Sequence, residues 1–460
     1  MTSTPRIVIV GAGPTGLGAG YRLQELGYDD WALLEANDYV GGLATSFTDE
    51  AGFTYDIGGH VMFSHYDYYD DLVDKLMGGE YTELNREAWV WMEGRYIPYP
   101  FQNNIRDLDP STVYECVTGL IRAQREARPF TNFAEWVDAT FGAGIAKHFM
   151  IPYNFKVWAT PAELMSHVWI GERVSVVDVE AVLRNVILRD DQVSWGPNNT
   201  FRYPLRGGTG ALYEGLRAHV EDHLHLECPV TAVDPVTRRV HTADGPTWGY
   251  DVLLSTMPLN HLIARTEGVP DAVRAAVDGL HWSGSHIVGV GLDRPTDSTK
   301  NWVYYPEPEV PFYRVTYLSN YSPYMTASPG QTLLLTETSQ SPHKPEDPTT
   351  IVERVVDGLV TAGLMTDADR DLLVTTWLCS PSMSYPVPST TRDAALGVIQ
   401  PWLRDQGIWS RGRFGAWLYE IGNMDHSTMQ GVEFVNHVLT GAPEATWIPR
   451  GETAAAASVA

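Results

Sequence analysis

The chain has 460 residues, 44% of them apolar, so it is long enough for two or three domains, each with its own core. Its formal net charge of −25 argues against nucleic acid or an anionic membrane surface as a partner, because both require a basic face. Three widely spaced cysteines without metal-ligand spacing, no leader pattern and no apolar run of ~20 residues predict a cytoplasmic protein with reduced thiols and no membrane span.

The first predicted element is a strand that runs into a glycine-rich turn. Residues 6–10 have the pattern of a short buried strand, and a helix is expected from Thr15 onward. Between them, Gly11, Gly13 and Gly16 have the spacing G-x-G-x-x-G. The first glycine permits a tight turn, the second lets the backbone approach a pyrophosphate, and the third lets helix and strand pack closely. The turn therefore predicts a bound dinucleotide, with a purely structural glycine turn as the alternative.

A second predicted strand, Trp31–Leu34, strengthens the dinucleotide interpretation. It ends in Glu35, where an acidic side chain would accept hydrogen bonds from a ribose. Two glycine doublets follow, Gly41-Gly42 and Gly58-Gly59. Such pairs can be loop punctuation only. After a dinucleotide turn, we interpret them as places where the backbone runs close to a long cofactor.

The later elements are expected in three groups. Residues 61–200 are mostly helical in pattern. Short strands follow between residues 200 and 258, and residues 281–340 alternate as in a sheet with one solvated face. A last helix, His426–Leu439, is expected to have Asp425 as its N-cap.

These elements predict an α/β fold: a Rossmann-like FAD-binding domain in three distant pieces, with an inserted helical domain and an antiparallel β-sheet domain. The expected segments are 1–60, 205–258 and 400–445 for the cofactor domain, 61–200 for the mainly helical domain with substrate flaps, 259–399 for the antiparallel sheet domain that contacts substrate, and 446–460 for a disordered tail. Large flavoproteins commonly have a split cofactor domain, whereas a lone nicotinamide domain usually keeps its parts contiguous. The organisation therefore favours FAD over NAD.

Several motifs carry groups suited to a ligand. Residues 99–104, Tyr-Pro-Phe-Gln-Asn-Asn, present an aromatic ring and amides that can read a planar heterocycle, although a loop anchored in the core fits the same residues. Arg173 and Arg314 each lie among aromatic residues. In so acidic a chain a guanidinium in that setting suits a pyrophosphate, because it can bind two oxygens at once. A surface ion pair and simple sheet packing are the alternatives.

His60 follows the second glycine doublet directly. A lone histidine is usually structural, but these glycines would hold it against a flavin edge. The N-terminus of the last helix is expected to face the flavin ring or the pyrophosphate. The sequence contains no serine-triad elbow, P-loop or zinc spacing, so no metal site is predicted.

A series of longer motifs makes the chain recognisable. They are Gly-Gly-His60-Val-Met-Phe-Ser-His65, Pro-Tyr99-Pro-Phe-Gln-Asn-Asn, Pro-Tyr-Asn-Phe-Lys-Val-Trp158, Gly-Glu-Arg173, Trp-Gly-Pro-Asn198, Phe-Arg-Tyr-Pro, Arg-Gly-Gly-Thr-Gly210, Phe-Tyr-Arg314, Ser-Asn-Tyr321-Ser-Pro-Tyr and Ser-Arg-Gly-Arg413-Phe-Gly. In this order, from about residue 6 to residue 440, they closely resemble the UDP-galactopyranose mutases, in particular their eukaryotic, fungal-type branch.

The resemblance implies an isomerase that uses FAD without net redox change. In that family N5 of the reduced flavin attacks the anomeric carbon of the sugar and expels UDP, and the adduct opens and recloses through a different hydroxyl before UDP returns. The implied reaction interconverts UDP-galactopyranose and UDP-galactofuranose through a covalent flavin N5–sugar adduct. NAD(P)H as the reductant and a homo-oligomeric assembly are further expectations.

The resemblance also assigns roles by position. The implied catalytic residues are His60, Arg173 and Arg314. The implied substrate contacts are Tyr99, Phe101, Gln102, Asn154, Trp158, Asn198, Tyr304, Tyr385 and Tyr419. The implied cofactor contacts are Gly11, Gly13, Thr15, Gly16, Glu35, Gly42, Leu43, Ala44, Gly58, Gly59, His60, Arg413, Gly422, Asn423, Met424 and Ser427. Flaps around Arg173 and Asn198 would exclude water.

Some positions depart from the fungal pattern, which has asparagine, serine and glutamine where this chain has Ser194, Ala88 and Met424. These changes affect the expected identity of the sugar, the use of NAD(P)H as the reductant and the oligomeric assembly. They do not alter the arginines or the residues expected to bind the flavin. Two alternatives stay open: the same chemistry on another UDP- or dTDP-hexopyranose, and an amine-oxidase-like FAD oxidoreductase. The second alternative would leave Arg173 and Arg314 without a purpose.

Overall fold

The computed structural model describes residues 5–126, 128–171, 174–189, 199–243 and 245–449. Two predicted site residues, Arg173 and Asn198, lie outside these described residues, as do Ser194 and most of the predicted tail.

A five-stranded parallel sheet forms the first layer of the molecule. Its order is β20 (Ile408–Ser410), β13 (Val252–Ser255), β1 (Ile7–Val10), β2 (Trp31–Leu34) and β9 (Leu224–His225). Every residue of β1 and β2 is buried, which explains why both strands are continuous apolar runs. Strands from three distant parts of the chain thus form one sheet, and the predicted α/β, Rossmann-like fold class is confirmed.

Two helices from opposite ends of the chain pack closely beside this sheet. They are α1 (Pro14–Glu25) and α12 (Met424–Thr440). Glycine is needed where they meet, because a Cβ on Gly431 would lie 2.0 Å from the carbonyl oxygen of Thr15. The N-cap of α12 is Asn423, so the prediction of Asp425 as the cap is wrong. Asp425 lies in the first turn, and its carboxylate accepts hydrogen bonds from His65 instead.

An eight-stranded sheet forms the centre of the molecule. Its order is β18 (Leu373–Cys379), β14 (His281–Leu292), β17 (Thr332–Gln340), β16 (Arg314–Tyr317), β15 (Trp302–Tyr304), β6 (Ala88–Met92) and β7 (Arg95–Pro98), with β19 (Tyr385–Val387) paired to one end of β14. The pairings are antiparallel except between β15 and β6.

The central sheet differs from the expectation at its far edge, where β6 and β7 come from the segment expected to be mainly helical. In β6, Ala88, Val90 and Met92 are buried while the two tryptophans between them are less so. This alternation is typical of a strand with one buried face. The half-buried positions are occupied by tryptophans, which are themselves apolar, so the sequence does not show the alternation of apolar and polar residues that marks a strand.

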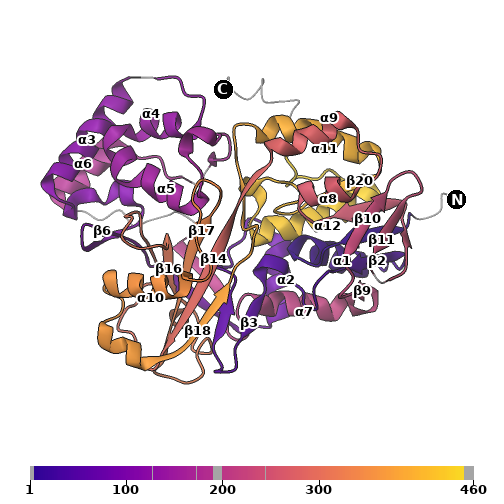
Figure 1. The fold of residues 1–460 in the computed structure, drawn as a ribbon, viewed down its shortest axis with the longest axis horizontal. Helices are drawn as coiled ribbons and strands as arrows, with labels where there is room; N and C mark the ends of the chain where they lie inside the picture. Colours follow the sequence, from indigo (N-terminus) through magenta and orange to yellow (C-terminus); the bar gives the residue numbers. More distant parts are fainter. Residues whose placement is uncertain (1–4, 127, 172–173, 190–198, 244, 450–460) are drawn as a thin grey trace.

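The helical part of the 61–200 segment packs around its own apolar core. Its helices are α3 (Pro110–Arg125), α4 (Phe133–Ile145), α5 (Ile151–Trp158) and α6 (Val179–Leu188). Figure 1 shows these helices at one end of the molecule and α1 and α12 at the other, with β14 and β17 between them. The central sheet therefore joins the two ends.

Among the described residues, the remaining elements are helices and the strands of three smaller sheets. Helices α8 (Leu259–Arg265), α9 (Asp271–Ala276) and α11 (Arg392–Asp405) pack into the core of the parallel sheet, although α8, α9 and the first part of α11 were expected in the antiparallel domain. The other elements are β3 (Ser46–Thr48), β4 (Thr54–Asp56), α2 (Asp67–Met77), β5 (Tyr81–Asn85), β8 (Thr200–Pro204), α7 (Gly210–Val220), β10 (Val230–Asp234), β11 (Arg239–Thr242), β12 (Trp248–Gly249) and α10 (Ile351–Thr361). Within the described residues, no helix is both long and apolar enough to cross a membrane.

Candidate active site

A cavity of about 1330 Å³ is lined by residues of all three parts of the fold. Its walls include the β1–α1 turn, α5, strands β15, β16 and β17, and the N-terminus of α12. The predicted site residues that line it are Gly11, Gly13, Thr15, Glu35, Gly42, Leu43, Ala44, Gly58, Gly59, His60, Tyr99, Gln102, Asn154, Trp158, Tyr304, Arg314, Tyr385, Arg413, Tyr419, Gly422, Asn423, Met424 and Ser427.

The glycine turn forms an open cradle at one end of the cavity. Gly11 has a φ of +97°, and a Cβ there would lie 2.2 Å from Thr256 Oγ1. A Cβ on Gly13 would meet no protein atom within 4 Å, although Gly13 lines the cavity. Backbone N–H groups at the start of α1 can therefore approach a ligand, as phosphate binding at a helix N-terminus requires.

Gly16 and Glu35 complete this end in different ways. Gly16 does not line the cavity; a Cβ there would lie 1.9 Å from the carbonyl oxygen of Gly11, so this glycine serves helix–strand packing. The Glu35 carboxylate lines the cavity and accepts hydrogen bonds from the N–H groups of Ala12 (2.7 Å) and Asn37 (2.9 Å). Oε1 also accepts from Asn37 Nδ2 at 2.7 Å, so Oε2 is the oxygen with a further lone pair for a ribose hydroxyl.

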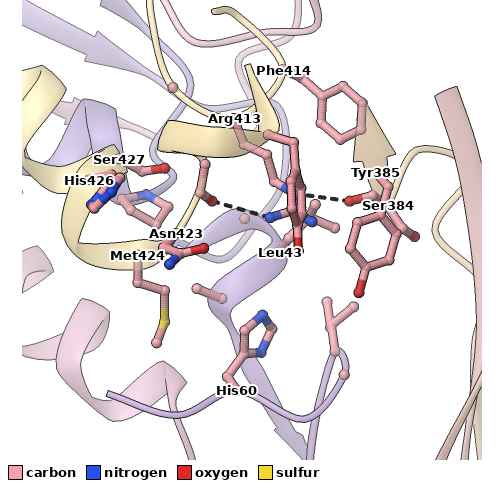
Figure 2. Close-up of a pocket in the computed structure, with 18 of the residues that line it drawn as sticks. Leu43, His60, Ser384, Tyr385, Arg413, Phe414, Asn423, Met424, His426 and Ser427 are labelled. Atoms are coloured by element: carbon pink, nitrogen blue, oxygen red, sulfur yellow. Dashed lines mark hydrogen bonds between the residues drawn. The ribbon is translucent and has the colours of Figure 1, made fainter. Parts of the chain in front are cut away.

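His60 lies deeper in the cavity, after the doublet Gly58-Gly59. Its Nδ1 is buried and makes no hydrogen bond within the described residues. Burial lowers the pKa of His60. Asp56 and Glu337 raise this pKa, whereas Arg413 and Arg314 lower it further. The imidazole is therefore neutral at pH 7 and has a free polar atom for a ligand. Figure 2 shows its ring directed toward the space that Arg413 and Asn423 border.

Arg413 is fixed by backbone oxygens from two loops. Its Nε donates to the Ser384 carbonyl at 2.9 Å and its Nη1 to the Gly422 carbonyl at 3.1 Å (Figure 2). The guanidinium lies 4.8 Å from the ring centroid of Tyr385, a cation–π distance. The residues here fit FAD, because the open cradle at Gly13, the N-termini of α1 and α12 and the unpaired His60 Nδ1 all border one cavity.

An aromatic wall forms the other end of the cavity. Tyr304 packs against Tyr99 and Tyr153, with ring centroids 5.1 and 5.2 Å apart. Trp158 packs against Tyr419 at 4.7 Å and Tyr385 at 5.6 Å. Such a wall can stack a planar base and donate tyrosine hydroxyls to a phosphate.

Gln102 offers the amide that the motif predicted. Its Nε2 donates to the Ser175 carbonyl at 2.7 Å, and its Oε1 is buried without a hydrogen-bond partner among the described residues. An acceptor left in this way is available to a ligand N–H. Phe101 differs from the expectation: it is fully buried in the helical core and stacks on Phe149 at 4.4 Å. Its ring therefore supports the wall from behind.

Arg314 is held by a buried carboxylate, Glu337, that the sequence analysis missed. Arg314 Nε donates to Glu337 Oε1, the Gly59 N–H donates to the same oxygen at 3.1 Å, and the Tyr313 hydroxyl donates to Oε2 at 2.7 Å. Tyr313 is also within 3.2 Å of the Tyr385 hydroxyl. Burial alone would raise the pKa of Glu337, but Arg314, Tyr313 and Gly59 hold it below its usual value.

Glu337 therefore carries a charge that fixes the guanidinium of Arg314. It also ties the arginine to the loop that bears His60. The signal in the sequence was a lone acidic residue in an otherwise apolar and threonine-rich strand, because a buried carboxylate needs partners.

His65, Asp425 and His426 form a titratable cluster near the start of α12, and all three also line the cavity. Their potential ligand atoms lie within 4.8 Å of one another, close enough for a metal ion. His65 Nδ1 and Asp425 Oδ2 are 2.7 Å apart and form a hydrogen bond. No metal was predicted from the sequence, and the cluster has a structural use in holding the chain before α2 against α12.

Known proteins share this architecture. The family model described as flavin containing amine oxidoreductase matches residues 14–415. A solved structure of reduced UDP-galactopyranose mutase is 44% identical, covers 96% of this chain and 96% of its own, and superposes with a TM-score of 0.93. A putative protoporphyrinogen oxidase from Exiguobacterium sp. 255-15 shares the fold alone, at 18% identity over 95% of this chain and 99% of its own, with a TM-score of 0.72.

Curated relatives match over short segments. Polyamine oxidase 7 of Oryza sativa subsp. japonica is 51% identical over 41 residues, and polyamine oxidase 1 of Zea mays is 42% identical over 57 residues. These matches cover 9% and 12% of this chain, and 9% and 11% of the relatives. The chain belongs to the flavin-containing amine oxidoreductases and, among them, to the UDP-galactopyranose mutase family.

Proposed function

We propose that this protein is a flavin-dependent, non-redox mutase that interconverts UDP-galactopyranose and UDP-galactofuranose. The observation that carries the proposal is one cavity with a dinucleotide cradle at one end and, at the other, a partly buried arginine among tyrosines that a buried carboxylate holds. A solved mutase that is 44% identical over nearly the whole chain supports it. An oxidase that acts on amines would have no use for a diphosphate clamp.

In this reaction the protein binds, orients and shields the nucleotide sugar. The aromatic wall and Gln102 Oε1 would hold the base, and Arg314 with the hydroxyls of Tyr304, Tyr385 and Tyr419 would hold the diphosphate. Charge on the departing UDP is greatest when the glycosidic bond breaks, so a fixed guanidinium stabilises that state most. Reduced FAD, when bound, supplies the nucleophile that displaces UDP from the sugar.

His60 would serve the same step from the cofactor side. Because its imidazole is neutral, His60 adds no positive charge to the cavity, and its Nδ1 is available to a ligand. Arg173 and Asn198 are proposed from the sequence resemblance as a second diphosphate contact and a sugar contact.

The test is an anaerobic assay of the dithionite-reduced protein with UDP-galactofuranose, and in reverse with UDP-galactopyranose, read by chromatography of the two isomers. We expect each to yield the other, and the oxidised protein and Arg314→Ala to be inactive or at least about 100-fold slower, since removing one partner of a buried charge pair costs ~2–5 kcal/mol. Absence of interconversion, with oxygen consumed on an amine in a parallel aerobic assay, would refute the proposal.

The finer assignments belong to the proposal as well. The motif match supports the fungal-type branch, with NAD(P)H as the reductant and a homo-oligomer, and the widely spaced cysteines support a cytoplasmic location. Conversion of another UDP- or dTDP-hexopyranose is the second candidate. The departures from the fungal pattern at Ser194, Ala88 and Met424 keep this candidate open.

A further inference from the structure

Lys156 is a buried lysine that has no role in the proposed reaction as described above. It lies on α5, and the residue is 7% exposed. Its Nζ donates to the carbonyl oxygens of Glu307 at 2.7 Å and Val310 at 2.9 Å. Within the described part of the chain, no carboxylate forms an ion pair with it.

The loop that Lys156 contacts controls the diphosphate end of the cavity. Residues 305–313 join β15 to β16, and at the base of this hairpin Tyr304 pairs directly with Arg314. Both residues line the cavity. A hydrogen bond to this loop therefore acts on the positions of the tyrosine and the arginine together.

A second contact ties the same residue to the next strand. The Ser339 hydroxyl donates to the main-chain carbonyl of Lys156. Ser339 lies on β17, two residues after Glu337, the carboxylate that holds Arg314. Lys156 is thus attached to the loop that precedes Arg314 and to β17, the strand that pairs with β16.

The helix that carries Lys156 belongs to the nucleoside end of the cavity. Tyr153, Asn154 and Trp158 of α5 all line the cavity. Lys156 therefore links the wall expected to hold the base and ribose to the hairpin expected to hold the diphosphate. These two surfaces must be correctly spaced if one nucleoside diphosphate is to reach both.

The buried amine is costly, which argues that it has a purpose beyond stability. Burial, with Lys344 nearby, lowers the pKa of Lys156 to about 7, although Glu309, Glu307 and Glu346 act in the opposite direction. Replacement of buried ionic groups by apolar residues of similar volume is often neutral or stabilising. A methionine here would relieve the desolvation cost and leave two carbonyls without this donor.

We propose that Lys156 is a positioning residue that sets the spacing between the nucleoside wall and the diphosphate clamp. The inference rests on the proposed function, because it assumes a ligand that spans both surfaces. Loss of the Nζ contacts should weaken ligands that span both surfaces and leave ligands of the nucleoside wall alone unchanged.

The test compares binding of UDP and of uridine to the FAD-loaded protein by calorimetry. In Lys156→Met we expect the dissociation constant for UDP to rise about tenfold, which is ~1.4 kcal/mol, and that for uridine to change less than about twofold. Lys156→Gln, which can still donate one hydrogen bond, should give an intermediate loss. The matched control is Lys300→Met, because Lys300 is a half-buried lysine over the rings of Trp89 and Tyr96, outside the cavity.

An unchanged ratio of UDP to uridine affinity in folded, flavin-loaded Lys156→Met would overturn the proposal, whether both affinities stay at the wild-type value or both fall equally. If that variant does not fold, Lys156→Gln carries the same comparison. A wild-type protein that binds UDP no better than uridine would instead refute the diphosphate clamp itself, and with it the proposed function.

Discussion

Glu337 is the residue on which the geometry of Arg314 most depends. Its two oxygens accept from Arg314, Tyr313 and Gly59, so its charge joins the diphosphate clamp to the His60 loop. Glu337→Gln keeps the shape but places an amide N–H against donors and removes the counter-charge. We expect UDP affinity and kcat to fall about 30-fold, or ~2 kcal/mol, with FAD content unchanged.

The matched control for Glu337→Gln is Glu444→Gln, which breaks another buried arginine pair, with Arg411, away from the cavity. That variant should lower the melting temperature and leave UDP affinity unchanged. Wild-type UDP affinity in Glu337→Gln would contradict the role given to Glu337.

His60 makes a pH-dependent contribution to stability whose sign follows from its burial. Its pKa in the folded state is below the ordinary 6.5, so the unfolded chain binds a proton more readily. Its contribution is therefore fully present above pH 6.5 and is lost as the pH falls from there through the folded pKa. We expect His60→Asn to lose less stability than wild type between pH 7 and pH 5, measured by denaturant unfolding of the apoprotein. Parallel pH profiles would contradict a neutral, buried His60.

At the scale of elements, the glycine turn separates ligand binding from packing. Gly13 has ordinary extended backbone angles and an open cavity beside it, whereas a Cβ at Gly16 would collide with the Gly11 carbonyl. Gly13→Ala should fold with a wild-type melting temperature as apoprotein but bind FAD weakly, because its methyl occupies ligand space. Gly16→Ala should lower the melting temperature of the apoprotein itself.

The two glycine variants are compared by flavin absorbance per protein and by thermal unfolding without FAD. Full FAD occupancy in Gly13→Ala, or an equally unstable apoprotein in both variants, would contradict the phosphate cradle.

The elements also show what the sequence could predict. Strands β1, β2 and β13 are short apolar runs whose burial on both faces makes the pattern plain. The predicted start of α12 is two residues late, because Asp425 is of a residue type that favours the N-cap. In the structure its carboxylate binds His65, which comes from a distant loop. That contact exists only in the folded chain.

At the scale of the whole molecule, the cavity is built from segments hundreds of residues apart. Most of the site residues that the motifs predicted line this cavity, since each motif carries its own chemistry or a family resemblance. Phe101 and Glu337 show the limit: an aromatic residue in a binding motif turned out to pack in the core, and an acid in a strand turned out to hold the clamp. Both outcomes depend on which segments meet, which no local pattern records.

The central claim is that the flavin is used without net oxidation, and counting turnovers per reducing equivalent tests it most directly. The protein is reduced once with a stoichiometric amount of dithionite, without oxygen, and given excess UDP-galactofuranose while flavin absorbance is followed. We predict many UDP-galactopyranose molecules per flavin, with the flavin still reduced at the end. Product limited to one molecule per flavin, with the flavin oxidised as it forms, would contradict the account.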